Sequence, residues 1–349
     1  MPAFVLRAAT SADSAGLAEL VAQSPDGGRV AFSPSYQVPF VEGMLARHRE
    51  AVGVVAEVPG GDGLIGAAWI SFGRCWVEGE LVDYAVLNSL VVHPRYRRLG
   101  VASAMTRWRL EHIDAERPDG VVMAGIQTGN VASLANARKW ANQVVGPVRV
   151  APVPTRRRRP PARRNDIEVR EARRDELDDV AAGINGFYDG YNFARTIDAA
   201  SLAAWTDEMV DGARLNHYFV AADQHGRLLT GVGIQAEAQL MTLRITHLPA
   251  LLRAVNVAAR VVPANREMRN ANARMLWFAT GQAAPARYLW QTIRWRWRHE
   301  ATNLVSMVDR RGAAEQMLQT PRWLPTTSLS IAVRSNRPLN VTRLLDPPV

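Results

Sequence analysis

Residues 85–104 read AVLNSLVVHPRYRRLGVASA, and this stretch decides the fold expected for the chain around it. Ala85–Val92 is an apolar run with the length and the β-branched content of a buried strand. The strand is expected to end before Pro94, because proline cannot donate to a strand ladder. A basic turn, Arg95–Leu99, leads into a segment whose apolar residues have helical spacing. The stretch therefore predicts a strand, a cationic turn and a helix in succession.

The beginning of that helix has the composition of a pyrophosphate site. The first turn of a helix exposes unpaired backbone N–H groups and the positive end of the helix dipole, which together attract phosphate. Gly100 and Ala102 are small, so phosphate oxygens can approach the backbone there. We therefore predict an anion-binding helix N-terminus at residues 100–103.

The pattern Arg97-x-x-Gly100-x-Ala102 resembles the pyrophosphate signature of the GNAT superfamily of N-acyltransferases. The preceding run, Leu90–Pro94, is similar to the strand of that family whose open end pairs with the pantetheine arm of acyl-coenzyme A (acyl-CoA). The resemblance covers residues 4–150 and implies acetyl-CoA or another acyl-CoA as the donor. The residues that it implies for donor binding are Leu90, Val91, Val92, Arg97, Arg98, Leu99, Gly100, Val101, Ala102, Ser103 and Asn130.

Two tandem domains are predicted, with the fold class α/β (α+β). Residues 1–152 form the GNAT domain, residues 153–165 a linker rich in arginine and proline, and residues 166–349 a degenerate GNAT-like domain. Each domain is expected to be a mixed, mostly antiparallel twisted sheet flanked by helices. The linker is expected to be extended and solvated, because prolines deny it regular structure and arginines repel one another.

The second half repeats the pattern of the first without its phosphate turn. Ile167–Ala172 repeats the opening strand of the chain, and a later glycine-rich hairpin recurs at a similar separation. The turn at residues 280–285 has no basic residue, and Pro285 lacks an N–H donor. We expect only the first half to bind coenzyme A (CoA) tightly.

Three further segments have two readings each. Ser24–Ser35 is expected to be a loop, and the aromatic residues Phe32, Tyr36 and Phe40 either line an acceptor site beside it or belong to the core. Leu248–Val262 is expected to form an amphipathic helix that packs on its own sheet or on the first domain. The run Arg294–Arg298 alternates arginine with tryptophan, which suits either base stacking or, with helical spacing, the core.

The acid and base groups common in GNAT enzymes are replaced in this chain. The position of the usual glutamate is Val86, and the position of the usual tyrosine is Ala137. Nearby polar side chains are the candidates to replace them. The catalytic candidates are Asn88, Tyr84 and Ser133. The alternatives are Ser89, Asn136, Glu78, Glu80 and Asp83, with Cys75 as an acyl-carrying nucleophile without motif support.

Length and composition bound the remaining possibilities. At 349 residues the chain can form two full cores, and its single cysteine excludes an internal disulfide. The histidines lack metal-ligand spacing, so no metal is expected. No secretory signal or membrane span is predicted, which favours a cytoplasmic protein. The net charge of +9 favours anionic partners such as CoA or an acidic carrier protein, while nucleic acid is less expected.

Three functions are compatible with these features. The leading one is transfer of an acyl group, in the first instance acetyl, from CoA to an amine of a small molecule or peptide, possibly in specialised metabolism. The second keeps the fold but takes the acyl group from an acidic acyl carrier protein. The third is a non-catalytic sensor of acyl-CoA.

Overall fold

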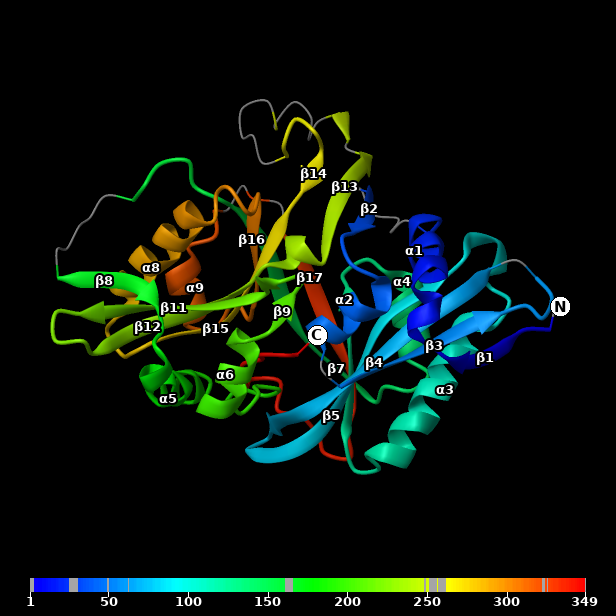
Figure 1. Ribbon diagram of the computed structural model, residues 1–349. Helices are drawn as coiled ribbons and strands as arrows, with labels where there is room; N and C mark the ends of the chain where they lie inside the picture. Colours follow the sequence, from blue (N-terminus) through cyan, green and yellow to red (C-terminus); the bar gives the residue numbers. More distant parts are fainter. Residues whose placement is uncertain are drawn as a thin grey trace.

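The computed structural model describes residues 3–24, 31–48, 50–61, 63–160, 166–247, 249–250, 256, 262–321, 324 and 326–348. It confirms the mixed fold class, with a mostly antiparallel sheet and helices on both of its faces (Figure 1). Among the described helices, none has the length and apolar character needed to cross a membrane.

The first half contains the predicted order of elements and one additional strand. Its elements are β1 (Val5–Ala8), α1 (Ser14–Ala22), β2 (Ala31–Tyr36), α2 (Phe40–Arg47), β3 (Ala51–Glu57), β4 (Leu64–Val77), β5 (Glu80–Val92), α3 (Val101–Glu116), β6 (Val121–Gln127), α4 (Val131–Ala137) and β7 (Gln143–Pro154).

The second half repeats this order with larger connections. Its main elements are β8 (Ile167–Glu171), α5 (Leu177–Phe187), α6 (Ala199–Thr206), β11 (Asn216–Asp223), β12 (Leu228–Gln235), the 3-10 turn η4 (Glu237–Gln239), β13 (Met241–His247), β14 (Glu267–Met268), β15 (Asn270–Phe278), α8 (Ala283–Arg296), β16 (Asn303–Val308), α9 (Ala314–Leu318) and β17 (Thr327–Arg334). A short hairpin of β9 (Met209–Val210) and β10 (Ala213–Arg214) precedes β11.

The two halves share one sheet and exchange their last strands. Across the described strands the order is β1-β3-β4-β5-β6-β17-β7-β16-β15-β12-β11-β8. Strand β17, from the end of the chain, lies between β6 and β7 and pairs antiparallel with both. Strand β7, from the first half, pairs antiparallel with β16 of the second half. Strand pairing therefore crosses the boundary predicted at residues 152–153, which falls within β7.

The helices lie in two layers, one on each face of the sheet. Side chains of α1 and α2 pack with Trp69 on what we call the front face, and α3 packs on the back face. In the second half, α5 and α6 pack on one face and α8 on the other. Phe193, which follows α5, packs against Tyr84 and Val86. These two residues pair with Gly73 and Ser71, which alternate from Trp69 along β4, so α5 also lies in front.

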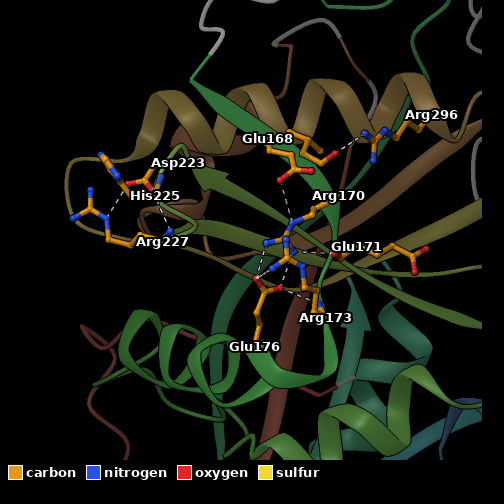
Figure 2. Close-up of polar contacts among 10 residues, drawn as sticks. Glu168, Arg170, Glu171, Arg173, Glu176, Asp223, His225, Arg227 and Arg296 are labelled. Atoms are coloured by element: carbon orange, nitrogen blue, oxygen red, sulfur yellow. Dashed lines mark hydrogen bonds and ion pairs between the residues drawn. The ribbon is translucent and has the colours of Figure 1, made fainter.

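A matching ion pair in each half supports the internal repeat. Arg7 of β1 donates to both carboxylate oxygens of Asp13, at 2.9 and 2.7 Å. Arg170 of β8 donates to both oxygens of Glu176, at 2.6 and 2.5 Å, as Figure 2 shows. Each carboxylate also accepts a backbone N–H three residues earlier in the chain, at the entry to the first helix of its half. The two halves thus begin with the same arrangement of strand, ion pair and helix.

A second, three-stranded sheet also connects the halves. Strand β2 pairs antiparallel with β13, which pairs with β14. The predicted loop at Ser24–Ser35 is therefore wrong from residue 31 onward, because β13 supplies a distant partner for an exposed strand. The predicted helix Leu248–Val262 lies almost entirely outside the described residues.

The first part of the predicted linker packs against α8. Arg294 donates to the carbonyl of Pro154 from Nε and Nη2, at 2.9 and 2.7 Å. The guanidinium groups of Arg159 and Arg298 lie 5.5 and 4.6 Å from the ring centre of Trp295. Trp297 belongs to the core, as one of the two readings of the Arg294–Arg298 run predicted. Residues 161–165 lie outside the described part of the chain.

Candidate functional site

The large sheet opens between β5 and β6. These strands pair in parallel only where Tyr84–Val86 face Val121–Met123. Beyond this point β6 pairs with β17, while β5 continues to Val92 with β4 as its partner. None of the described strands therefore pairs with the β5 backbone from residue 87 to residue 92 on its β6 side, and the polar groups of this backbone can pair with an extended ligand.

A bulge in β5 changes the direction of the open end of the strand. Ser89 has φ +48°, and the pairing with β4 gains one residue between Asn88 and Val91. A bulge of this kind bends the strand and increases its twist. Leu90, Val91 and Val92, three of the predicted donor contacts, lie on the bent end.

The chain turns sharply from β5 into α3. A 3-10 turn, Pro94–Tyr96, follows the strand, and Arg98 and Gly100 have φ +62° and +83°. Gly100 is the N-cap of α3, and a Cβ at this position would meet no heavy atom within 4 Å. The N–H groups of the first turn have no acceptors within the helix, and the space beside Gly100 is open to a ligand. The predicted residues at 97–103 are thus together at one helix N-terminus.

Helix α3 approaches the sheet closely through Gly66 of β4. A Cβ on Gly66 would lie 2.8 Å from Cε of Met105 and 3.0 Å from Cγ1 of Val101. Because both side chains are buried, there is no room for a larger residue. This contact fixes the N-terminus of α3 beside the open end of β5.

Arg97 and Lys139 each form a hydrogen bond close to this helix N-terminus. Arg97 donates from Nε to the carbonyl of Val92 at 3.2 Å, so its guanidinium folds back over the strand end. Lys139 follows α4, and its Nζ donates to Oγ of Ser103 at 3.0 Å. Sequence reasoning missed Lys139, although it is the only lysine among 42 basic residues, which is a signal in itself.

Helix α4 lies beside α3 and carries the remaining predicted residues. Asn130 is its N-cap and accepts the N–H of Ser133 at Oδ1, at 3.0 Å. Nδ2 of Asn136, one turn after Ser133, donates to Oγ1 of Thr106 on α3 at 3.0 Å. Ser133 and Asn136 therefore share the side of α4 that faces α3.

A buried arginine under the bulge is the second feature that sequence reasoning missed. Arg109 donates from Nη1 to the carbonyls of Trp69 and Asn88, at 3.2 and 3.4 Å, and from Nη2 to Oγ1 of Thr106 at 3.3 Å. It is 2% exposed, and burial lowers its pKa to about 10, so it stays charged at neutral pH. No carboxylate pairs with it among the described residues. Its signal in the sequence is a charged residue within the buried stripe Val101, Met105, Arg109 and Ile113 of α3.

The catalytic candidates on β5 point to the front face. Nδ2 of Asn88 donates to Oγ of Ser71 at 2.8 Å, immediately before the bulge. Tyr84 lies in the closed part of the sheet, where burial raises its pKa, and the charge and hydrogen bond of Arg195 oppose this rise. Asn88 is thus at the opening, while Tyr84 faces the second half of the chain.

The alternative catalytic residues have structural partners elsewhere. Oε1 of Glu78 accepts from Nδ2 of Asn192 at 2.6 Å and from the N–H of Asn340 at 2.8 Å. Glu80 pairs with Arg337 at 2.5 Å, and Asp83 lies 3.7 Å from Arg74. Cys75 is fully buried, and burial raises the pKa of its thiol to about 12, which opposes a nucleophilic role.

The second half has a similar opening without a comparable helix N-terminus. Strands β15 and β16 pair in parallel only through Ala273 and Ser306, and Met275 has φ +48°. Helix α8 begins at Ala283, and Pro285 removes a donor from its first turn. Its turn carries no cation of the kind that Arg97 and Lys139 supply.

Comparisons with known proteins agree with this architecture. Residues 28–141 match the model of the acetyltransferase (GNAT) family. A tandem GNAT protein from the clavulanic acid biosynthesis pathway has TM-score 0.60 at 14% identity, over 97% of this chain and 100% of that one. N-myristoyltransferase from Saccharomyces cerevisiae, solved with myristoyl-CoA, has TM-score 0.64 at 10% identity, over 96% of this chain and 80% of that one. No curated protein sequence matches significantly.

The chain carries a GNAT domain on a tandem GNAT fold. A GCN5-related N-acetyltransferase from Sphaerobacter thermophilus shares this fold, with TM-score 0.58 at 16% identity and coverage of 97% of both chains. The family match falls on the half that has the glycine turn and the opening between β5 and β6. The predicted family is therefore confirmed for residues 28–141, and the predicted tandem GNAT fold is confirmed for the whole chain.

Proposed function

We propose that this protein is an N-acyltransferase that moves an acyl group from a CoA thioester to an amine. The observation that carries the proposal is the position of the α3 N-terminus, opened by Gly100, beside the unpaired end of β5. The first would bind the pyrophosphate and the second the pantetheine arm. Acetyl is the acyl group proposed in the first instance.

The chemistry is direct attack of the amine on the thioester carbonyl within a ternary complex. The new C–N bond forms as the C–S bond breaks, the thiolate leaves with the electron pair of that bond, and the proton that the amine nitrogen loses ends on the thiolate. A backbone N–H on the bent end of β5, near Val91, would polarise the carbonyl. The charge of Arg109 beneath the bulge would favour the negative charge that develops there, and Ser133 or Asn136 would contact the sulfur.

Binding of CoA to the Gly100→Val variant tests this proposal. The new side chain would occupy the space of the phosphates, so we expect the dissociation constant from calorimetry to rise by at least about tenfold. Gly226→Val is the matched control, because Gly226 has φ +81° and equally open surroundings but lies in the hairpin turn between β11 and β12. Both variants carry a similar backbone strain of about 1–3 kcal/mol. Equal CoA affinity in the two variants would contradict the proposed site.

A carrier-bound donor is a second candidate, favoured by a specific feature of the turn. Arg95, Arg97 and Arg98 are all exposed at the mouth of the opening. A cationic rim of this kind would attract an acidic carrier protein that presents its acyl-phosphopantetheine arm. Transfer rates with acetyl-CoA and with an acetylated acyl carrier protein, measured on the same amine, distinguish the two donors.

A further inference from the structure

A cavity lies on the front face of the sheet, at the junction of the two halves. Its volume is about 230 Å³. Its lining includes Val150, Met307 and Leu329 of the central strands, Tyr188 directly after α5, and residues 346–348 of the C-terminal tail. This volume is below the roughly 300–1,000 Å³ of sites for drug-sized ligands, so it suits a ligand the size of an amino acid.

Two arginines face this cavity without a full complement of acidic partners. Arg274 of β15 donates from Nε to Oε1 of Gln235 at 3.2 Å, and burial lowers its pKa to about 10. Arg195 follows α5 and reaches toward the hydroxyl of Tyr84. Glu237 is nearby, but it already forms an ion pair with Arg47 and accepts from Nδ2 of Asn272 at 3.0 Å.

The positive charge of this region also lowers the pKa of a neighbouring histidine, His48. The pKa of His48 falls to about 3, first through burial and then through the charges of Arg274, Arg47 and Arg195. His48 is therefore neutral at physiological pH and adds no charge of its own. An anion entering the cavity would be attracted by the charges of Arg274 and Arg195.

One carboxyl group also faces the cavity. Asp346 is held there by its chain tail, because its N–H donates to the carbonyl of Asn192 at 3.0 Å and the N–H of Asn192 donates to Leu344 at 2.8 Å. Within the described part of the chain, no hydrogen bond reaches the side-chain oxygens of Asp346. The cavity therefore presents two guanidinium groups and one carboxyl group whose oxygens accept no hydrogen bond from the described residues.

Arg195, which lines the cavity, also forms a hydrogen bond with Tyr84 on the front face of β5. Tyr84, beside Arg195, is followed on the same face by Val86 and Asn88, which lead to the bulge. A ligand held between Arg195 and Asp346 would thus lie on the side of the sheet from which Asn88 faces the opening.

We infer that this cavity binds the acceptor, and that the acceptor is an amine that also carries a carboxylate. Arg195 and Arg274 bind the carboxylate, and Asp346 binds the ammonium group. The ligand carboxylate would accept charge-assisted hydrogen bonds from the guanidinium groups, and its ammonium group would give Asp346 the hydrogen-bond donor that it lacks among the described residues. This assignment rests on the proposed acyltransferase function, which it deepens by naming the class of acceptor.

Calorimetry with matched amines, at saturating CoA, tests the inference. The probes are short ω-amino acids of increasing length, such as 4-aminobutyrate, each beside its uncharged amide. We expect at least one acid to bind about tenfold or more tightly than its amide, since a charge-assisted contact to arginine is lost in the amide. The preference should disappear in Arg274→Gln and persist in part in Arg274→Lys. Binding of no acid, or equal binding of acid and amide, would overturn the inference.

Two further measurements separate this inference from the proposed function. CoA affinity should be the same in Arg274→Gln and in the natural protein, because the pyrophosphate site is remote. If Arg274→Gln fails to fold, Arg195→Gln, on an exposed loop residue, replaces it. Acids that bind while CoA does not would refute only the acyltransferase function, whereas CoA-dependent acetylation of acids and amides alike would refute only the inference.

Discussion

Lys139 is the only side-chain amine of the protein, and it lies at the first turn of α3 through its bond to Ser103. We predict that Lys139→Met weakens CoA binding by about three- to tenfold, because one exposed cation near the phosphates is lost. The salt dependence of the affinity should decrease with it. Arg138→Met is the control, since Arg138 is the exposed neighbour on the same turn. A similar loss in both variants would indicate a general effect of charge.

Asp346 should reduce the stability of the protein near neutral pH. Burial raises the pKa of Asp346 from the usual 3.8 to about 6, and the charges of Arg195 and Arg274 oppose the rise. The hydroxyls of Tyr188 and Tyr191 also interact with this carboxyl group. The folded state then holds the proton more tightly than the unfolded state, so stability falls as pH rises from about 4 to about 6. We predict that Asp346→Asn raises the free energy of unfolding at pH 7.5 by up to about 3 kcal/mol.

Thermal unfolding at two pH values checks this prediction. The gain in Tm should be present at pH 7.5 and absent near pH 4, where Asp346 is protonated in both states. Asp119→Asn, at an exposed position, should leave Tm unchanged at both values. A gain that is equal at both pH values would show that ionisation of Asp346 is not its cause.

The sequence reveals residues that a local pattern places together and hides those that meet only in space. Gly100 and Arg97 were predictable because a strand, a turn and a helix lie within twenty consecutive residues. Arg195, Arg274 and Asp346 were not, because the cavity brings together a loop, a strand and the chain tail. Arg109 is intermediate, since its place in an apolar stripe is visible but its carbonyl partners on β4 and β5 are not.

Helices α3 and α4 are joined to the opened sheet by one polar network centred on Thr106. Its hydroxyl donates to the carbonyl of Ala102 at 2.8 Å and accepts from Asn136 and Arg109. We predict that Thr106→Val lowers the free energy of unfolding by about 1–3 kcal/mol, because two buried donors lose their acceptor. Denaturant titration measures the change.

Thr206→Val is the matched control for this network. Its hydroxyl also donates to a helix carbonyl, that of Ala203 at 2.9 Å, but neither of the other two partner types is present. The loss in this variant should stay below about 1 kcal/mol. If both substitutions lower the free energy of unfolding equally, the network adds no stability beyond that of a single hydrogen bond.

At the level of elements, the order of strands and helices was predictable and their partners were less so. Alternating patterns and glycine turns identified β3, β4 and β5. Strand β2 was missed because its polar sequence gains strand structure only from β13, more than half the chain away. Residues 153–154 of the predicted linker are the end of β7, whose proline-rich sequence conceals a strand.

The two halves form one sheet because each contributes its last strand to the other. We predict that residues 1–152 alone do not fold to a CoA-binding domain, since β6 would lack β17 and β7 would lack β16. Residues 1–160 and 161–349 produced together should copurify and bind CoA. Size-exclusion chromatography and calorimetry check both expectations, and cooperative unfolding of the 1–152 fragment with intact CoA affinity would contradict them.

The sequence indicated a repeat correctly but could not show this exchange. A repeat of strands and helices fits two separate sheets as well as one shared sheet, because the pattern within each strand is the same in both. The choice is made by the pairing of β17 with β6 and β7, which depends on contacts between distant segments.

The position of β17 also sets the moment at which the protein can first work during its synthesis. Gln127 of β6 bonds Thr327 of β17 across 200 residues. A ribosome must therefore translate the chain through β17 before β6, which forms the wall of the opening, has this neighbour. Nascent chains that stop early expose a bare strand edge to chaperones and proteases, so quality control would remove them before they could sequester CoA.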